Sequence, residues 1–215
     1  YEKKYFYDFN VHLSKFNKSS FLTIDGFSNH SFECKIKSIN SHTALTENIF
    51  ETSNVSIVEQ GGIFRPENCN YTKKVAIIVP YRNRPQQLKI FLEYMHKFLT
   101  YQNIFYQIFI IEQDEQRLFN RGFLLNVGVI EALKRQEFNC LVFHDVDRIP
   151  KFVLNRYDCV SSPRHLSVQT DAEYYQPTYP LYAGGVTSIS TYHYMAVNGF
   201  SNIFWGWGGE DDDFY

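Results

Sequence analysis

Two carboxylates two residues apart follow an apolar run in the second half of the chain. The segment is His144-Asp145-Val146-Asp147, directly after residues 140–143. Because alternate residues of an extended segment point the same way, we expect Asp145 and Asp147 to face one side. Two carboxylates at a strand end are hard oxygen ligands that suit Mg²⁺ or Mn²⁺. A D-x-D motif by itself is also compatible with a pair of solvated surface carboxylates.

Three arginines lie next to other apolar or amphipathic segments of the chain, as the two carboxylates do. Arg82 and Arg84 follow the apolar run 75–79, and Arg121 precedes a second amphipathic segment. Guanidinium groups bind phosphate oxygens in a bidentate way, so these side chains could hold a diphosphate; the alternative is exposed solubilising charge. The sequence contains neither G-x-G-x-x-G nor G-x-x-x-x-G-K-[ST], so neither a Rossmann dinucleotide site nor a P-loop is supported. The remaining possibility is a nucleotide site in which a metal ion and arginines hold the phosphates.

The segment 204–213 combines aromatic rings, glycines and carboxylates. Its sequence is Phe-Trp-Gly-Trp-Gly-Gly-Glu-Asp-Asp-Asp. Two tryptophans among glycines make a poor core, because glycine costs backbone entropy and offers no side chain to pack. Aromatic faces beside carboxylates instead suit a sugar, which stacks on the rings and donates from its hydroxyl groups. The alternative is a helix that begins with acidic residues, which the helix dipole favours.

The elements that must position these residues alternate between strand and helix. The β-branched run 75–79, closed by Pro80, is typical of a buried strand, and Pro85 suits the first turn of a helix. We predict strands at 75–79, 106–111 and 140–143, and helices over the apolar stripes 88–99 and 125–133. This order predicts an α/β fold with a mostly parallel sheet. Ligands of such sheets bind at the carboxyl ends of the strands, which here means residues 81–84 and 145–147.

Composition excludes several classes of function. The chain has 215 residues, a net charge of −2 and 44% hydrophobic residues, so an electrostatic nucleic-acid binder and a disordered chain are both disfavoured. The apolar runs are far shorter than a membrane span, so we expect any membrane anchor to lie outside this chain. None of the four cysteines forms a C-x-x-C pair, which argues against zinc. Their even number allows two disulfides in three connectivities.

The first 73 residues differ from the rest. They are rich in Ser, Asn and Thr, show weak periodicity, and contain all four N-x-S/T sequons, at Asn17, Asn29, Asn54 and Asn70. We therefore divide the chain into a stem-like region, 1–73, and a domain, 74–215. The clustered sequons and even cysteine count favour a glycosylated protein of the secretory pathway.

A series of motifs from about residue 61 to the end resembles the β-1,4-galactosyltransferases of the animal Golgi. The WGWGGEDDD stretch, 205–213, is the most specific of them. The others are VPYRNR (79–84), FNR (119–121), LNVG (125–128), DVD (145–147), PRH (163–165), YAGGV (182–186) and NGF (198–200).

The resemblance implies a GT-A fold and an inverting, Mn²⁺-dependent transfer of galactose from UDP-galactose to O4 of a terminal N-acetylglucosamine. It also implies a type II membrane protein of the Golgi lumen whose anchor lies outside this chain. The alternatives are a UDP-N-acetylgalactosamine transferase or a xylosylprotein galactosyltransferase of the same family, or a non-catalytic sugar-binding relative. A metal-dependent nucleotidyltransferase would share the sheet and the D-x-D motif but would leave the WGWGGEDDD stretch without a role.

The resemblance also assigns roles to individual residues. Asp211 is the expected catalytic base, Asp147 the Mn²⁺ ligand, and Tyr182 the residue beside C2 of the donor sugar. Further metal ligands are expected beyond Tyr215, which makes the chain a C-terminally truncated member. Cys140 is expected to pair with Cys159, and Cys34 with Cys69. The acceptor is assigned to Gly209, Glu210, Asp211 and Asp212. UDP-galactose is assigned to Pro80, Tyr81, Arg82, Asn83, Arg84, Phe119, Asn120, Arg121, Asp145, Val146, Asp147, Tyr182, Gly185 and Trp207.

Overall fold

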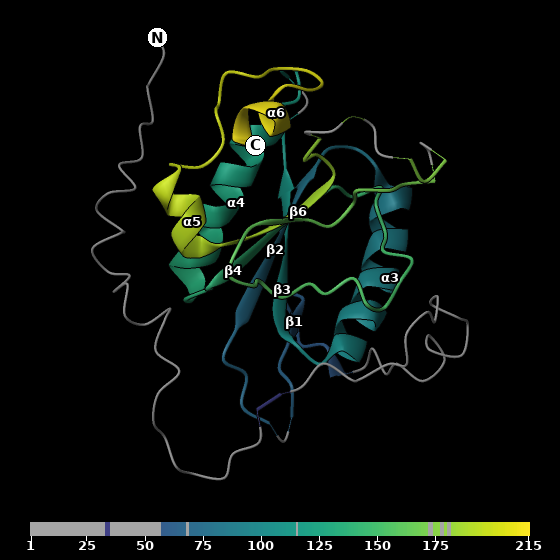
Figure 1. Cartoon of the computed structure of the whole chain (residues 1–215). Coiled ribbons are helices and arrows are strands. Elements are labelled where there is room, and N and C mark those ends of the chain that lie inside the picture. Colours follow the sequence, from purple (N-terminus) through teal and green to yellow (C-terminus); the bar gives the residue numbers. More distant parts are fainter. Residues whose placement is uncertain are drawn as a thin grey trace.

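The computed structural model describes residues 33–34, 57–67, 69–114, 116–171, 174–176, 179 and 182–215. Within them a six-stranded sheet has the order β1-β3-β2-β4-β6-β5, with helices on both faces (Figure 1). Its strands are β1 (Ile63–Phe64), β2 (Lys74–Tyr81), β3 (Phe105–Glu112), β4 (Cys140–His144), β5 (Arg164–His165) and β6 (Val186–Ser190). Its helices are α3 (Pro85–Gln102), α4 (Arg121–Arg135), α5 (Thr191–Ala196) and α6 (Glu210–Phe214).

The central strand β2 is buried on both faces, which explains its unbroken apolar sequence. Val75, Ile77 and Val79 pack in the same cluster as the apolar side chains of α3, such as Phe91 and Met95. Ala76 and Ile78 point the other way and pack with Leu125 and Val129 of α4. Figure 1 shows α3 on one side of the sheet and α4 with α5 on the other. The alternation follows from the two-residue period of a strand.

Two crossovers place strands on opposite sides of the central strand β2. The chain passes from β2 through α3 to β3, and then through α4 to β4, and β3 and β4 pair with β2 on its two sides, both in parallel. A change of direction of this kind leaves an opening at the carboxyl ends of the strands. The predicted strands and helices are confirmed, and the ends of β2 and β4 deliver residues 81–84 and 145–147 to that opening.

The sheet is mixed, because three of its strand pairings are antiparallel. β1 pairs with β3, β6 with β4, and β5 with β6. The sequence predicted a mostly parallel sheet, and the three central strands β3, β2 and β4 are parallel. The sequence analysis did not predict β5 and β6, which are short and carry polar residues that hide the apolar pattern of a strand. β6 brings the preceding Gly184 and Gly185 next to the end of β4, where the Asp145 amide donates to the Gly185 carbonyl oxygen (3.0 Å).

Helix α4 lies close to the sheet at Gly128. A Cβ atom at this position would approach Ile78 Cγ2 to 2.2 Å and Ile111 Cγ1 to 2.9 Å, so glycine is required for the observed packing. The helix begins after Asn120, whose side-chain oxygen accepts from the Phe123 amide (2.9 Å) as an N-cap. The cap and the glycine together fix the helix start at the carboxyl end of the sheet.

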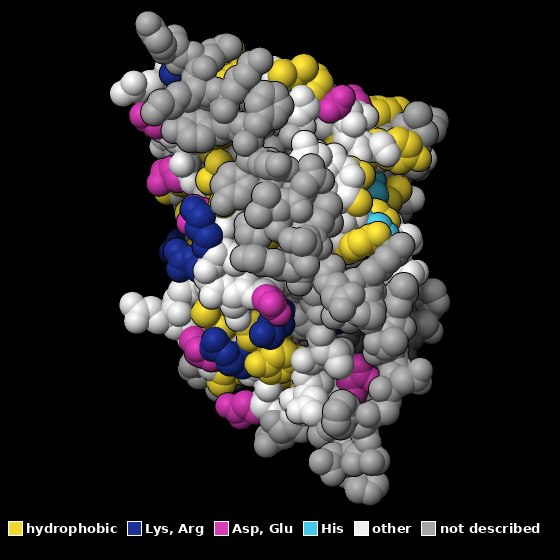
Figure 2. Space-filling view, turned by 90° about the vertical axis from the view of Figure 1, so that its left-hand side faces the viewer, with side chains coloured by type: hydrophobic (Ala, Val, Ile, Leu, Met, Phe, Trp, Pro, Cys, Tyr) yellow, Lys and Arg dark blue, Asp and Glu magenta, His cyan; other side chains and the backbone are white. Residues whose placement is uncertain are grey.

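Both predicted disulfides, Cys34–Cys69 and Cys140–Cys159, are present. The predicted division of the chain at residues 73 and 74 stays a proposal, and β1, from the region before it, already belongs to the sheet. Among the described residues, no helix has both the length and the apolar character needed to cross a membrane. Figure 2 shows the face that carries α4 and α5, on which both basic and acidic side chains are visible among the described residues.

Candidate active site

A cavity of about 910 Å³ lies at the carboxyl ends of β2 and β4. It is bounded by the start of α4, the segment before β6, and the loop that leads into α6. Its lining residues are Pro80, Arg82, Arg84, Leu118, Phe119, Arg121, Asp145, Val146, Asp147, Arg148, Tyr179, Tyr182, Gly185, Gly206, Trp207, Gly208, Gly209, Glu210, Asp211 and Asp212. The sequence-predicted donor and acceptor residues therefore meet, with few exceptions, around one cavity.

Arg121 joins three elements at the base of this cavity. Its Nε donates to Asp145 Oδ1 (2.7 Å) after β4, and its Nη1 to Glu210 Oε1 (3.2 Å) at the start of α6. The side chains of Arg121 and Glu210 are 14% and 7% exposed. Burial alone would lower the pKa of Arg121, but Asp145 and Glu210 outweigh it and the pKa is raised. The guanidinium thus stays charged and holds α6 against the D-x-D segment.

Asp147 occupies the outer side of the same segment. Its carboxylate accepts from Arg84 Nη1 (2.7 Å), and the side chain is 46% exposed. Residues 145–148 form a turn, closed by the Arg148 amide donating to the Asp145 carbonyl oxygen (3.2 Å). The segment is therefore not extended as predicted, yet both carboxylates line the cavity while Val146 between them is buried.

The donor set at Asp147 fits a hard divalent cation. Mg²⁺ and similar ions are commonly held by one or two carboxylates together with substrate phosphates and water. Asp147 offers such a carboxylate, open to the cavity and next to arginines that suit a diphosphate. Within the part of the chain that the structure describes, no group of three or more His, Cys, Asp or Glu side chains could hold a metal ion. The described residues thus offer carboxylates at the cavity rather than a complete metal cage.

The buried His144 supports the D-x-D turn from behind. Its Nδ1 lies 2.8 Å from the Asp145 carbonyl oxygen and its Nε2 lies 2.8 Å from the Tyr157 hydroxyl. Because a carbonyl oxygen can only accept, Nδ1 carries the proton and Nε2 accepts from Tyr157. Burial lowers the pKa of His144 to about 4. The neutral imidazole therefore fixes the start of the turn that carries both carboxylates.

Asp211 and Tyr182 meet above Gly184. A Cβ atom at Gly184 would lie 2.1 Å from Asp211 Oδ2 and 2.7 Å from the Tyr182 hydroxyl oxygen, so any side chain at this position would displace one of them. The Tyr182 ring packs edge-on against His165 (centroids 5.3 Å apart) and Tyr179 (5.2 Å). Burial raises the pKa of Tyr182, so its hydroxyl stays protonated. A carboxylate and a fixed phenol ring thus share one wall of the cavity.

The acidic helix start predicted from residues 210–213 is present as α6, and its members have different surroundings. Asp212 accepts a hydrogen bond from the Tyr179 hydroxyl, which raises the pKa of that hydroxyl to about 12. Glu210 is buried against Arg121, whereas Asp211 is partly exposed to the cavity. Trp207, on the loop before the helix, is fully exposed at the rim. The arrangement leaves Asp211 as the carboxylate best placed to act on a ligand.

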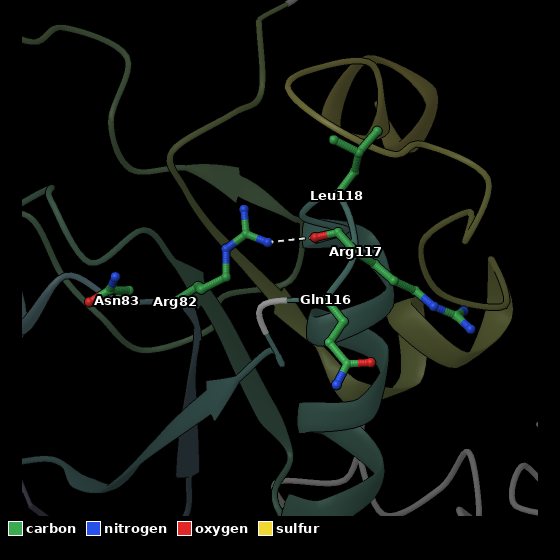
Figure 3. A pocket seen from close by; sticks show the side chains of 5 residues that line it. All are labelled: Arg82, Asn83, Gln116, Arg117 and Leu118. Atoms are coloured by element: carbon green, nitrogen blue, oxygen red, sulfur yellow. Dashed lines mark hydrogen bonds between the residues drawn. The ribbon is translucent and has the colours of Figure 1, made fainter.

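A second pocket of about 640 Å³ is lined by Arg82, Asn83, Gln116, Arg117 and Leu118 (Figure 3). Arg82 Nη1 donates to the Arg117 carbonyl oxygen (2.7 Å), and its guanidinium lies 5.2 Å from the centre of the Phe119 ring. The Arg117 side chain points away from Arg82 in Figure 3. Because Arg82 and Leu118 line both pockets, the second pocket extends the first past the end of β2.

Three sequence-predicted donor residues do not line the main cavity. Asn83 lines the second pocket. Tyr81 is 7% exposed, and its hydroxyl accepts from the Arg84 amide (3.1 Å). Asn120 is 1% exposed and caps α4. Tyr81 and Asn120 therefore support their arginine neighbours from within the fold.

The sequence analysis missed Arg148, Tyr179 and Leu118, which also line the cavity. Arg148 directly follows the D-x-D motif, and this position could have drawn attention to it. The predicted glycosylation sites Asn17, Asn29 and Asn54 lie outside the described residues. Asn70 is exposed, and its modification stays a prediction.

Comparisons with known proteins agree with this geometry. Residues 15–160 match the family described as the N-terminal region of glycosyl transferase group 7, and residues 164–215 match the N-terminal domain of galactosyltransferase. The chain belongs to the β-1,4-galactosyltransferase family. It is 48% identical to β-1,4-galactosyltransferase 4 of Cricetulus griseus over 153 residues, which cover 71% of this chain and 44% of that protein. It is also 48% identical to β-1,4-galactosyltransferase 1 of Bos taurus over 158 residues, which cover 74% of this chain and 39% of that protein.

Solved structures of this family confirm the GT-A fold. The catalytic domain of Drosophila β-1,4-galactosyltransferase 7 in complex with xylobiose has a TM-score of 0.59 and 33% identity, covering 66% of this chain and 59% of that one. A point mutant of the same enzyme, with a TM-score of 0.59 and 31% identity over the same shares of both chains, was solved with manganese, UDP-Gal and xylobiose. The chain spans less than half the length of the two sequence relatives named above.

Proposed function

We propose that the protein transfers galactose from UDP-galactose to O4 of a terminal N-acetylglucosamine, with inversion at the anomeric carbon. The observation that carries this proposal is that Asp211 of α6 lines the same cavity as the Asp145–Asp147 turn and Arg84. An acceptor base therefore faces residues suited to a nucleoside diphosphate. Membership of the β-1,4-galactosyltransferase family, and the UDP-Gal and manganese bound by a structural relative, support the choice of donor and metal.

The residues of the cavity account for a single displacement. Asp211 takes the proton of the acceptor hydroxyl as its oxygen forms the bond to the anomeric carbon, and UDP leaves from the opposite side. Arg82 and Arg84 hold the diphosphate, and Arg121 keeps Asp145 oriented toward the donor. Trp207 and Asp212 contact the two sugars. No covalent intermediate is required, because one carboxylate at the acceptor is enough for inversion.

We assign Asp147 as the ligand that this chain gives to Mn²⁺. When bound, the ion neutralises negative charge on the leaving diphosphate as a Lewis acid. We expect Asp147→Asn to abolish Mn²⁺-dependent transfer in the full-length protein, because an amide oxygen is a much weaker ligand for a hard cation. Transfer rates and UDP binding would be measured over a Mn²⁺ titration. Unchanged Mn²⁺ dependence of both quantities would contradict the assignment.

The activity itself is tested with UDP-galactose, Mn²⁺ and a β-linked N-acetylglucosamine acceptor, and the linkage of the product is determined. Transfer only to a β-xyloside would favour the xylosylprotein galactosyltransferase alternative. Sugar binding without transfer in the full-length protein would favour a non-catalytic relative. The family and the position of Asp211 support transfer of galactose to O4 of N-acetylglucosamine.

Tyr182 is proposed to exclude UDP-N-acetylgalactosamine. The ring is held by His165 and Tyr179, and it shares the wall with Asp211, so it has little freedom to make room for a 2-acetamido group. We expect Tyr182→Leu to raise transfer of N-acetylgalactosamine relative to galactose by about tenfold to a few hundredfold. The kcat/KM values for the two donors would be compared. Equal use of both donors by the wild-type protein would contradict the proposed exclusion of UDP-N-acetylgalactosamine by Tyr182.

We further propose a Golgi lumenal protein of type II topology, with the anchor outside this chain. The family supports the compartment, and the two disulfides agree with an oxidising environment. The sequon at Asn70 agrees with it too, because Asn70 is exposed and precedes the amino end of β2, whereas the cavity lies at the carboxyl end.

A further inference from the structure

Arg148 is a cation on the cavity wall to which the transfer described above assigns no role. It is the last residue of the turn that begins at Asp145, and its amide closes that turn by donating to the Asp145 carbonyl oxygen (3.2 Å). The turn places Asp145, Asp147 and Arg148 on the lining of one cavity. The same four-residue segment therefore presents two carboxylates and one guanidinium to the ligand.

The neighbours of Arg148 belong to the segment that precedes β6. A Cβ atom at Gly185, where φ is +80°, would lie 3.8 Å from Arg148 Nε and 2.6 Å from Ser167 Oγ. The positive charge of Arg148 also acts on two rings of this wall. It adds to the burial that lowers the pKa of His165, and it opposes the burial that raises the pKa of Tyr182. The guanidinium thus lies at the Gly185–Tyr182 wall.

The other three arginines of the cavity come from other elements than Arg148 does. Arg84 pairs with Asp147, Arg121 with Asp145 and Glu210, and Arg82 donates to the Arg117 carbonyl oxygen beside the second pocket. Arg82 and Arg84 follow β2, whereas Arg148 follows β4 and faces the segment that carries Tyr182. Tyr182 shares its wall with Asp211, which in the proposed reaction deprotonates the acceptor hydroxyl that attacks the anomeric carbon. Arg148 therefore lies at the sugar end of the donor.

We propose that Arg148 binds the hexose of the nucleotide-sugar donor by donating hydrogen bonds to a sugar oxygen. This inference rests on the proposed function and adds a donor-sugar residue to it. A guanidinium can only donate hydrogen bonds, whereas the Asp145 carboxylate across the turn can only accept them. Because a sugar hydroxyl both donates and accepts, the two side chains together can bind it in both ways. The contact distinguishes UDP-hexose from UDP, which lacks the sugar.

Binding of UDP and of UDP-galactose to the full-length protein separates a sugar contact from a phosphate contact. Dissociation constants for both nucleotides would be measured by calorimetry in the presence of Mn²⁺. We expect Arg148→Leu to weaken UDP-galactose binding by about tenfold to a hundredfold, the range for loss of a charged hydrogen-bond donor. The affinity for UDP should stay at the wild-type value. Arg148→Lys keeps one charged donor and should give an intermediate loss for UDP-galactose alone.

Arg135→Leu is the matched control, because Arg135 is exposed at the far end of α4 and lines neither pocket. It should bind both nucleotides as the wild type does. Equal weakening of UDP and UDP-galactose by Arg148→Leu would place the contact at the diphosphate and overturn the inference, as would unchanged binding of both. A wild-type protein that binds neither nucleotide would contradict the proposed function, and the inference with it.

Discussion

Asp211→Asn is expected to lower kcat by about 10²–10⁴-fold, the contribution of a well-placed general base. Asparagine has nearly the same shape as aspartate but cannot take a proton at neutral pH. It can therefore occupy the same space above Gly184 and beside Tyr182. We therefore expect donor binding and the unfolding temperature to stay close to those of the wild-type protein. The rate would be measured with UDP-galactose and an N-acetylglucosamine acceptor, both at saturating concentration.

Asp213→Asn is the matched control for this prediction. Asp213 lies in the same helical turn as Asp211 but is exposed and does not line the cavity. Both substitutions remove one negative charge from the first turn of α6, which changes stability by roughly 0.3–1 kcal/mol. Only the first removes the base. If both variants lost the same small fraction of kcat, the four acidic residues would act through the helix dipole, and the base would have to be another group.

The sequence predicted the central part of the fold because its physical signals are local. Residues 75–79 are apolar without interruption, since β2 is covered by α3 on one face and α4 on the other. Pro80 was expected to close this strand, but β2 continues to Tyr81. Pairing with β4 ends at Ile78, so one side of the strand is already open where proline lacks its amide hydrogen.

The parts that the sequence could not predict depend on contacts between distant segments. β6 is recognised only by its pairing with β4, because Ser and Thr interrupt its apolar pattern. In the same way, Glu210 stands in a run of four acidic residues. Only its ion pair with Arg121, which is distant in the sequence, distinguishes it from the other three. The D-x-D motif was visible because a strand end and two carboxylates occur together in the sequence. The ionic partner that orients it lies 24 residues earlier, at Arg121.

Arg121→Met should destabilise the fold by about 3–5 kcal/mol, the cost of breaking a buried ion pair by removing one partner. Methionine fills most of the volume of arginine but carries no charge. It therefore leaves the Glu210 carboxylate, which is 7% exposed, and the Asp145 carboxylate without their cation. The matched control is Arg65→Met. The Arg65–Glu59 pair is exposed on both sides, 42% and 51%, so its loss should cost less than about 1 kcal/mol. Urea unfolding of both variants gives the two free energies.

The cause of the loss can be separated from a simple packing defect. If the uncompensated charge is responsible, Glu210→Gln added to Arg121→Met should restore part of the stability, because a neutral amide is easier to bury than a carboxylate. A loss equal to that of Arg65→Met, or one that Glu210→Gln does not relieve, would show that Arg121 does not hold α6 to the D-x-D turn through charge.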